Sequence, residues 1–191
     1  MKSQKPKPTV LELSPRNTIV FNAIVIGPTV QYAIRKLREL DKKLAPGEPI
    51  YVLLDTPGGS VIDGMNFINA ANSLDRPVHT ITIFAASMGF VFVQHLGTRY
   101  ILPNGILMSH RGKVGVQGEI NGELDELIRF FKEISRQIDE VCAERLGMKL
   151  EEYQKRIADE WWLYGSEAIK HDAADEVVLI KCSAEMESCP F

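Results

Sequence analysis

The sequence IYVLLDTPGGSVIDG, residues 50–64, decides the fold class of this chain. Its first five residues are continuously apolar, which is typical of a strand buried on both faces of a parallel sheet. A turn with Pro-Gly-Gly follows over residues 55–60, and residues 61–74 are a helix candidate. A buried strand that passes through a tight turn into a helix is the repeating unit of α/β proteins. We therefore predict this class, with a largely parallel sheet.

The same alternation of strand and helix extends through most of the chain. We predict further strands over residues 18–26, 78–84, 99–102, 105–108 and 176–180, and helices over residues 29–44, 87–96, 123–146, 150–157 and 166–171. The glycine-rich residues 112–122 indicate a flexible segment or a hairpin. Composition divides the chain into a flexible N-terminal arm (residues 1–16), a single domain (residues 17–181) and a C-terminal tail (residues 182–191).

The composition is that of an ordinary globular domain. The 191 residues are 45 % hydrophobic and 25 % charged, with a formal net charge of -3, which gives no electrostatic basis for binding nucleic acid or an anionic membrane. No apolar stretch resembles a signal peptide or a membrane span, so we expect a cytoplasmic protein without a membrane partner.

The cysteines and histidines predict neither a metal site nor another cofactor, because no cluster of them has zinc-ligand spacing. The three cysteines are Cys142, Cys182 and Cys189, and an odd count outside a small disulfide-rich domain suggests free thiols in a reducing compartment. Cys182 and Cys189 are nevertheless close enough in sequence to form a disulfide within the tail.

Three segments carry residue types that suggest catalysis, and each follows a predicted strand, where ligands bind in open α/β sheets. Gly58 and Gly59 can expose backbone N–H groups to a ligand, although a tight turn alone would also explain them. Ser87 lies between a strand and a helix, as a hydrolase nucleophile does, although a helix N-cap has the same position. His110 ends a strand and is either a general base or a structural histidine. Together these segments supply the nucleophile, base and oxyanion donors of acyl transfer.

Four segments resemble, in order, motifs of the proteolytic subunit of the Clp protease family. They are LLDTPGGSVIDGM (residues 53–65), ITIFAASMGF (81–90), LPNGILMSHR (102–111) and SEAIKHDAADEV (166–177), and the resemblance runs from about Val20 to Val178. It implies a Clp protease/crotonase-like fold made of repeated β-β-α units, with a mainly parallel sheet and a protruding handle helix.

The resemblance also implies a serine endopeptidase that cleaves peptides or unfolded proteins inside an oligomeric chamber. Ser87 is then the nucleophile and His110 the base, while the N–H groups of Gly59 and Met88 form the oxyanion hole. The implied substrate-binding residues are Gly58, Lys113, Val114, Gly115 and Val116, which pair with a peptide as an added strand. The implied assembly is a heptameric ring, stacked in pairs, with an AAA+ unfoldase as a further partner.

The third member of the catalytic triad is Glu160 or Asp159. Counting without gaps from the family's motif gives Glu160, whereas Asp159 has the family's side chain but lies one residue earlier. Consecutive residues of an extended segment point to opposite faces, so only one of them can reach His110. We predict Glu160, with Asp159 as the alternative acid and a Ser–His dyad as the third interpretation.

The sequence departs from the family pattern close to the predicted site. Ile83 and Phe84 precede Ala-Ala-Ser where the family has polar residues, and Arg111-Gly112-Lys113 follow the histidine. These departures indicate a divergent member. The alternative functions are a crotonase-type acyl-CoA enzyme and a non-catalytic scaffold subunit of a similar ring.

Overall fold

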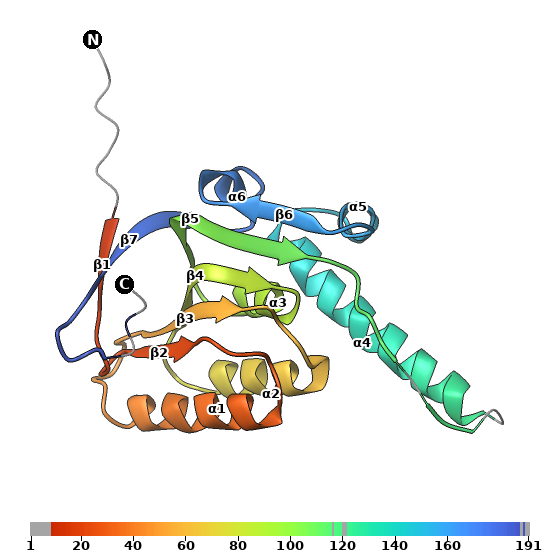
Figure 1. The fold of residues 1–191 in the computed structure, drawn as a ribbon, viewed down its shortest axis with the longest axis horizontal. Helices are drawn as coiled ribbons and strands as arrows, with labels where there is room; N and C mark the ends of the chain where they lie inside the picture. Colours follow the sequence, from red (N-terminus) through yellow and green to blue (C-terminus); the bar gives the residue numbers. More distant parts are fainter. Residues whose placement is uncertain (1–8, 116, 120–121, 188, 190–191) are drawn as a thin grey trace, which may run out of the picture.

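The computed structural model describes residues 9–115, 117–119, 122–187 and 189. Its strands form one seven-stranded sheet in the order β1-β7-β5-β4-β3-β2, with β6 paired to β5 outside this path (Figure 1). All pairings are parallel except that of β6 with β5, which confirms the predicted α/β class. The strands are β1 (Thr9–Leu13), β2 (Thr18–Phe21), β3 (Ile50–Thr56), β4 (Val78–Ala86), β5 (Arg99–Ser109), β6 (Trp161–Tyr164) and β7 (Glu176–Cys182).

Helices α1, α2 and α3 lie along one face of the sheet, while α4 projects away from it (Figure 1). The helices are α1 (Gly27–Asp41), α2 (Val61–Asn72), α3 (Met88–His95), α4 (Glu123–Arg145), α5 (Leu150–Arg156) and α6 (Ser166–Lys170). Apolar residues of α1 recur every three or four positions, so they form one stripe that packs on the sheet. The main core lies between these helices and strand residues such as Val52 and Leu54.

The N-terminal region differs from the sequence prediction. Residues 9–13, predicted as part of a flexible arm, form β1, which pairs in parallel with β7. Leu13 is buried against the sheet, and Leu11 packs beside it. The arm prediction is therefore wrong for these five residues, because a partner strand at the other end of the chain orders them. Residues 1–8 lie outside the described residues.

A single strand, β5, replaces the two short strands predicted over residues 99–108. Its pairing with β4 shifts in register, so that Thr82 pairs with Ile101 and Phe84 pairs with Ile106. Pro103 and its neighbours lie in this irregular part of the strand, where the sequence suggested a break. Proline has no N–H to donate to the ladder, and the bulge accommodates it. The strand continues through the bulge and reaches the same edge of the sheet as β4.

A smaller apolar cluster covers the opposite face of the sheet. It contains Leu13, Leu53, Ile81, Leu102, Val178 and Met186. Met186 belongs to the C-terminal tail, and the tail is tied to β1 because Ser183 N–H donates to Leu13 O at 2.8 Å. The tail therefore closes the end of the sheet where the two termini of the domain meet.

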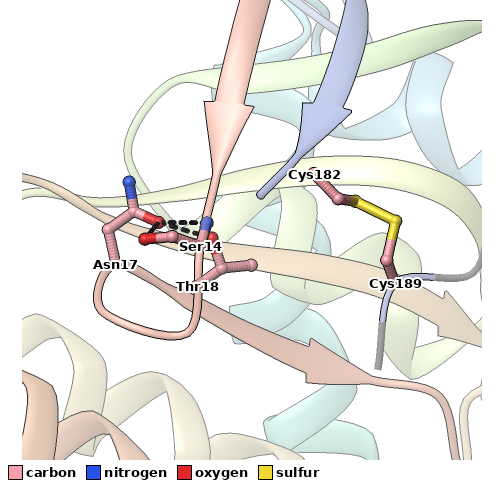
Figure 2. The surroundings of a disulfide bond; sticks show 5 residues. All are labelled: Ser14, Asn17, Thr18, Cys182 and Cys189. Atoms are coloured by element: carbon pink, nitrogen blue, oxygen red, sulfur yellow. Dashed lines mark hydrogen bonds between the residues drawn. A yellow bond between two sulfur atoms is a disulfide. The ribbon is translucent and has the colours of Figure 1, made fainter. Parts of the chain in front are cut away.

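A disulfide joins Cys182, the last residue of β7, to Cys189, close to the turn in which Asn17 Oδ1 accepts from Ser14 and Thr18 (Figure 2). The expectation of free thiols is wrong for this pair, since the tail folds back and brings the two sulfur atoms together. Cys142 is free and buried in α4.

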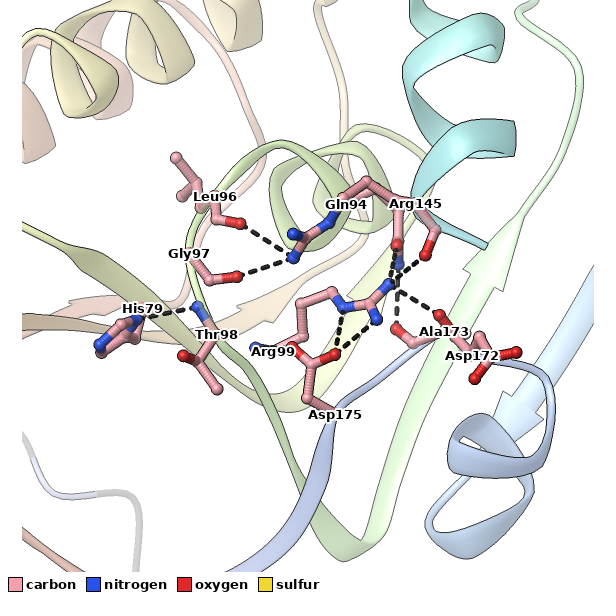
Figure 3. Close-up of polar contacts among 10 residues, drawn as sticks. All are labelled: His79, Gln94, Leu96, Gly97, Thr98, Arg99, Arg145, Asp172, Ala173 and Asp175. Atoms are coloured by element: carbon pink, nitrogen blue, oxygen red, sulfur yellow. Dashed lines mark hydrogen bonds and ion pairs between the residues drawn. The ribbon is translucent and has the colours of Figure 1, made fainter. Parts of the chain in front are cut away.

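Arg99 at the start of β5 is buried and joins several parts of the fold (Figure 3). Its guanidinium donates to Asp175 Oδ1 at 3.1 Å, to Gln94 Oε1 at 2.7 Å, and to the carbonyl oxygens of Arg145 and Asp172 at 3.0 and 2.7 Å. A buried charge is tolerated when it is paired and its donors are used. These contacts fix the ends of α3 and α4 against β5 and the start of β7.

The N-terminal half of α4 is not packed against the sheet of its own chain. The buried residues of this helix are Ile138, Cys142 and Ala143, all in its C-terminal half. Ile128 and Phe130 lie in the N-terminal half and keep 38 % and 49 % of their surface exposed. This is the protruding helix that the sequence predicted. In the described part of the chain, no helix is both long and apolar enough to cross a membrane.

Reduction of the Cys182–Cys189 disulfide should lower the free energy of unfolding, because the bond restricts the unfolded chain. The two cysteines are separated by 7 residues in sequence, and a loop of this length corresponds to about 2–3 kcal/mol. Thermal unfolding of the wild type and of Cys189→Ser, each with and without dithiothreitol, measures the effect. The wild type should lose stability on reduction and the variant should not. An equal response of both proteins would contradict a stabilising disulfide.

Candidate active site

Ser87 stands between β4 and α3 in a backbone conformation that non-glycine residues rarely adopt. Its φ is 55° and its ψ is -116°, and such strain persists where the surrounding structure holds it, often at functional sites. Its N–H donates to Met108 O at 2.8 Å, which fixes the turn to β5. The side chain does not cap α3, so the helix-cap interpretation does not apply and Oγ is available to other groups.

His110 follows β5 directly, and its imidazole lies against Ser87. Nε2 is 2.9 Å from Ser87 Oγ, which is hydrogen-bond distance, and the hydroxyl donates when the neutral ring carries its proton on Nδ1. The side chains meet because β4 and β5 are adjacent parallel strands that end at the same edge, with Ala86 paired to Met108. Within the described residues, the buried Nδ1 of His110 has no hydrogen-bond partner.

The glycine turn after β3 lies against the Ser87 turn. Gly58 has a φ of 90°, and a Cβ added there would lie 2.5 Å from Ala86 O and 2.7 Å from Met88 N. The position therefore requires glycine for its backbone conformation and for its close approach. This contact holds the two turns together at the edge of the sheet.

Gly59 and Met88, the two predicted oxyanion donors, lie in the two turns that meet at this edge of the sheet. Val25 N–H donates to Gly58 O and Ser60 N–H donates to Val25 O, both at 2.8 Å. Gly59 lies between these two hydrogen-bonded neighbours. In a parallel bridge the residue in this position directs its own N–H away from the partner strand. Met88 is the first residue of α3, where the N–H has no partner within the helix. Among the described residues, neither N–H donates to a backbone carbonyl.

The two candidate acids lie just before β6 in the chain. β6 pairs antiparallel to β5, from Ile106 with Tyr164 to Ser109 with Trp161. The ladder ends at Ser109 and Trp161, and an extension of the pairing by one step would set Glu160 opposite His110. Asp159 lies one residue further from the strand, in a bend.

The carboxylate of Glu160 is directed to a different partner. Its Oε2 accepts a hydrogen bond from Trp162 Nε1 at 3.1 Å, and the residue is exposed. Asp159 is exposed as well, and no hydrogen bond joins either acid to His110. The described structure thus brings two of the three predicted catalytic side chains into contact and leaves the third nearby. Trp162 was not identified as a site residue from sequence, although its position two residues from Glu160 in an extended segment places both on one face.

A cleft of about 620 Å³ opens beside the glycine turn, between the residues after His110 and α4. Lys113 and Val114, two of the predicted substrate-binding residues, line it together with Gly59. Gly115 is exposed, and Val116 lies outside the described residues. Residues 112–115 form no strand, so pairing of a substrate with this segment stays a prediction. The volume of the cleft is large enough for several peptide side chains.

Burial shifts the pKa of two further titratable groups, Cys142 and Asp139. Among the residues that the structure describes, no group of three His, Cys, Asp or Glu side chains is arranged to hold a metal ion. Burial raises the pKa of the Cys142 thiol to about 12, so it is not a nucleophile near neutral pH. Burial also raises the pKa of Asp139, at the wall of the cleft.

The fold and the site together define a mainly parallel α/β protein with a serine–histidine pair at its strand ends. The Clp protease family model matches residues 9–181. The chain is 31% identical over 166 residues to the ATP-dependent Clp protease proteolytic subunit 1 of Chlamydia muridarum. The alignment covers 84% of this chain and 85% of the relative. The corresponding protein of Chlamydia trachomatis is 30% identical over the same shares. The chain therefore belongs to the Clp protease family, as predicted, and is a divergent member.

Replacement of Gly59 by alanine should disrupt the turn that carries the oxyanion donor. Its φ is 149°, and an added Cβ would lie 2.3 Å from the carbonyl oxygen of Val25. We expect a cost of at least about 2 kcal/mol, or roughly 4–8 °C in melting temperature. Gly27→Ala is the control, since its Cβ would make only an ordinary contact with Asp63 at 3.6 Å. Equal melting temperatures for the two variants would refute this account of the turn.

Proposed function

We propose that this protein is a serine endopeptidase that cleaves peptides or unfolded polypeptides. The observation that carries the proposal is the 2.9 Å contact between Ser87 Oγ and His110 Nε2, beside two free backbone N–H donors, in a chain of the Clp protease family. Peptidase activity follows from the family. The serine mechanism rests on this arrangement of nucleophile, base and oxyanion donors.

In the proposed mechanism His110 Nε2 takes the proton of Ser87 Oγ as the oxygen attacks the peptide carbonyl carbon. The carbonyl oxygen becomes an oxyanion, which accepts hydrogen bonds from the N–H groups of Gly59 and Met88. The imidazolium returns the proton to the amide nitrogen, which leaves as an amine, and an acyl-enzyme remains. Water then attacks the ester carbonyl as His110 accepts its proton, and the imidazolium gives that proton to the leaving Ser87 Oγ as the acid product is released. No cofactor is needed for these steps.

Glu160 is the proposed acid that orients His110 and stabilises its cation. The register that places it opposite His110 supports this choice over Asp159. Rotation of the carboxylate from Trp162 Nε1 toward His110 Nδ1 would complete the triad, because a carboxylate has several acceptor sites. The unpartnered Nδ1 also favours a second candidate function, a scaffold subunit that retains the fold without catalysing hydrolysis.

The proposed assembly is a homo-oligomeric chamber built of stacked heptameric rings. The exposed apolar surface of α4, with Ile128 and Phe130, supports contacts between subunits. The relatives are named as proteolytic subunits of an ATP-dependent protease, which makes an AAA+ unfoldase the proposed partner. The cleft beside Lys113 and Val114 is the proposed binding site for the substrate chain. A cytoplasmic location stays a prediction.

Ser87→Ala should abolish peptide hydrolysis while the oligomeric state stays unchanged, because only Oγ is removed. Labelling with a fluorophosphonate probe, followed by intact mass and peptide mapping, should give one adduct on Ser87 in the wild type. The adduct should be absent in Ser87→Ala and in His110→Ala. Ser73→Ala, an exposed serine at the end of α2, is the matched control. Full hydrolysis by Ser87→Ala would refute the assignment, and an assembled wild type without any adduct would favour the scaffold function.

Glu160→Gln should lower kcat at least tenfold, because the neutral amide stabilises the imidazolium poorly. Asp159→Asn should change kcat less than twofold, since its side chain points to the other face. Steady-state hydrolysis of a fluorogenic peptide measures both variants. The reverse order would assign the acid to Asp159, and wild-type kcat in both would indicate a Ser–His dyad.

A further inference from the structure

Ser109, the residue before His110, makes a buried hydrogen bond to α5. Its Oγ is 2.8 Å from the hydroxyl oxygen of Tyr153. Only 4 % of the Ser109 surface and 2 % of the Tyr153 surface is exposed, so water does not replace this bond. Burial raises the pKa of Tyr153, which keeps its hydroxyl neutral. A buried hydroxyl that loses its partner bears the full cost of desolvation, so the pair favours one fixed geometry.

The residue after His110 is held by the same segment. Arg111 N–H donates to Ile157 O at 3.2 Å, and Arg111 Nη2 donates to Gln154 O, also at 3.2 Å. The segment around α5 therefore contacts both neighbours of His110. His110 itself depends on these neighbours, because among the described residues its ring has a hydrogen bond only with Ser87, and its Nδ1 has no hydrogen-bond partner.

α5 is itself fixed to the body of the protein. Tyr153 is the buried residue of this short helix, and its hydroxyl also lies beside the thiol of Cys142 in α4. Gln154 Nε2 donates to Asp139 Oδ2 of α4 at 3.1 Å. These contacts with α4 therefore also resist a displacement of α5 relative to the end of β5. The same chain segment continues to Glu160, so it sets the position of both the base and the proposed acid.

We propose that Tyr153 is a positioning residue that keeps His110 within reach of Ser87 through its hydrogen bond to Ser109. This role rests on the proposed function of the site. The bond holds the last residue of β5 at a fixed distance from α5, and His110 follows one residue later. A small displacement of the imidazole would change the 2.9 Å distance between His110 Nε2 and Ser87 Oγ. It would slow proton transfer and leave the cleft unchanged.

The test compares Tyr153→Phe, Ser109→Ala and the double variant with the wild type. Tyr51→Phe in β3 is the matched control, because it removes a tyrosine hydroxyl remote from His110. For each protein we would measure kcat and KM for a fluorogenic peptide, the rate of fluorophosphonate labelling of Ser87, and the melting temperature. All rates are taken well below the lowest melting temperature, and Ser109→Ala carries the test if Tyr153→Phe does not fold.

We expect both single variants to lower kcat and the labelling rate about tenfold, with KM changed less than twofold. The double variant should resemble either single variant, because all three lack the same hydrogen bond. Tyr51→Phe should keep the wild-type rates. A lower melting temperature with an unchanged kcat in both single variants would overturn the positioning role. Absence of labelling in the wild type would instead refute the serine peptidase assignment, and the positioning role with it.

Discussion

The site depends on the parallel pairing of β4 with β5, which ends both strands at the same edge of the sheet. The pairing of Ala86 with Met108, together with the bond from Ser87 N–H to Met108 O, places the strained serine turn beside the end of β5. His110 follows at that point, and the contact between imidazole and hydroxyl is a consequence of this register. A slip of one residue would turn His110 to the other face of the sheet.

Strand β3, the other neighbour of β4, adds its glycine turn to the site in the same way. β3 also ends at this edge, and its glycine turn contacts the Ser87 turn so closely that Gly58 has no room for a side chain. The bridge between Val25 and Gly59 leaves one N–H directed into the site. Three adjacent parallel strands thus bring Ser87, His110 and the glycine turn to one edge of the sheet. Backbone hydrogen bonds hold the Ser87 turn and the glycine turn, whereas the residue before His110 is held by a side-chain bond from Ser109 to Tyr153.

The two sides of the molecule differ in whether their apolar residues are covered. At one side, β1 and the tail close the sheet with an apolar cluster, a hydrogen bond and a disulfide. At the other side, α4 extends from the body with apolar residues exposed (Figure 1). Arg99 fixes the base of α4 through the carbonyl of Arg145, while α5 links α4 to the end of β5. The helix with the exposed apolar residues is therefore connected to the part of the protein that holds His110.

The sequence by itself determined the fold class, most helices, and the positions of Ser87, His110 and the glycine turn. These features are encoded locally: continuous apolar runs, helical spacing, and small residues where a turn requires them. Only the tertiary structure decided features that depend on distant partners. β1 forms because β7 lies beside it, the disulfide forms because the tail folds back, and β5 continues through Pro103 because β4 accommodates a bulge. Likewise, the hydrogen bond from Trp162 Nε1 to Glu160 depends on how the chain folds around residue 160 and could not be predicted from the order of Asp159 and Glu160.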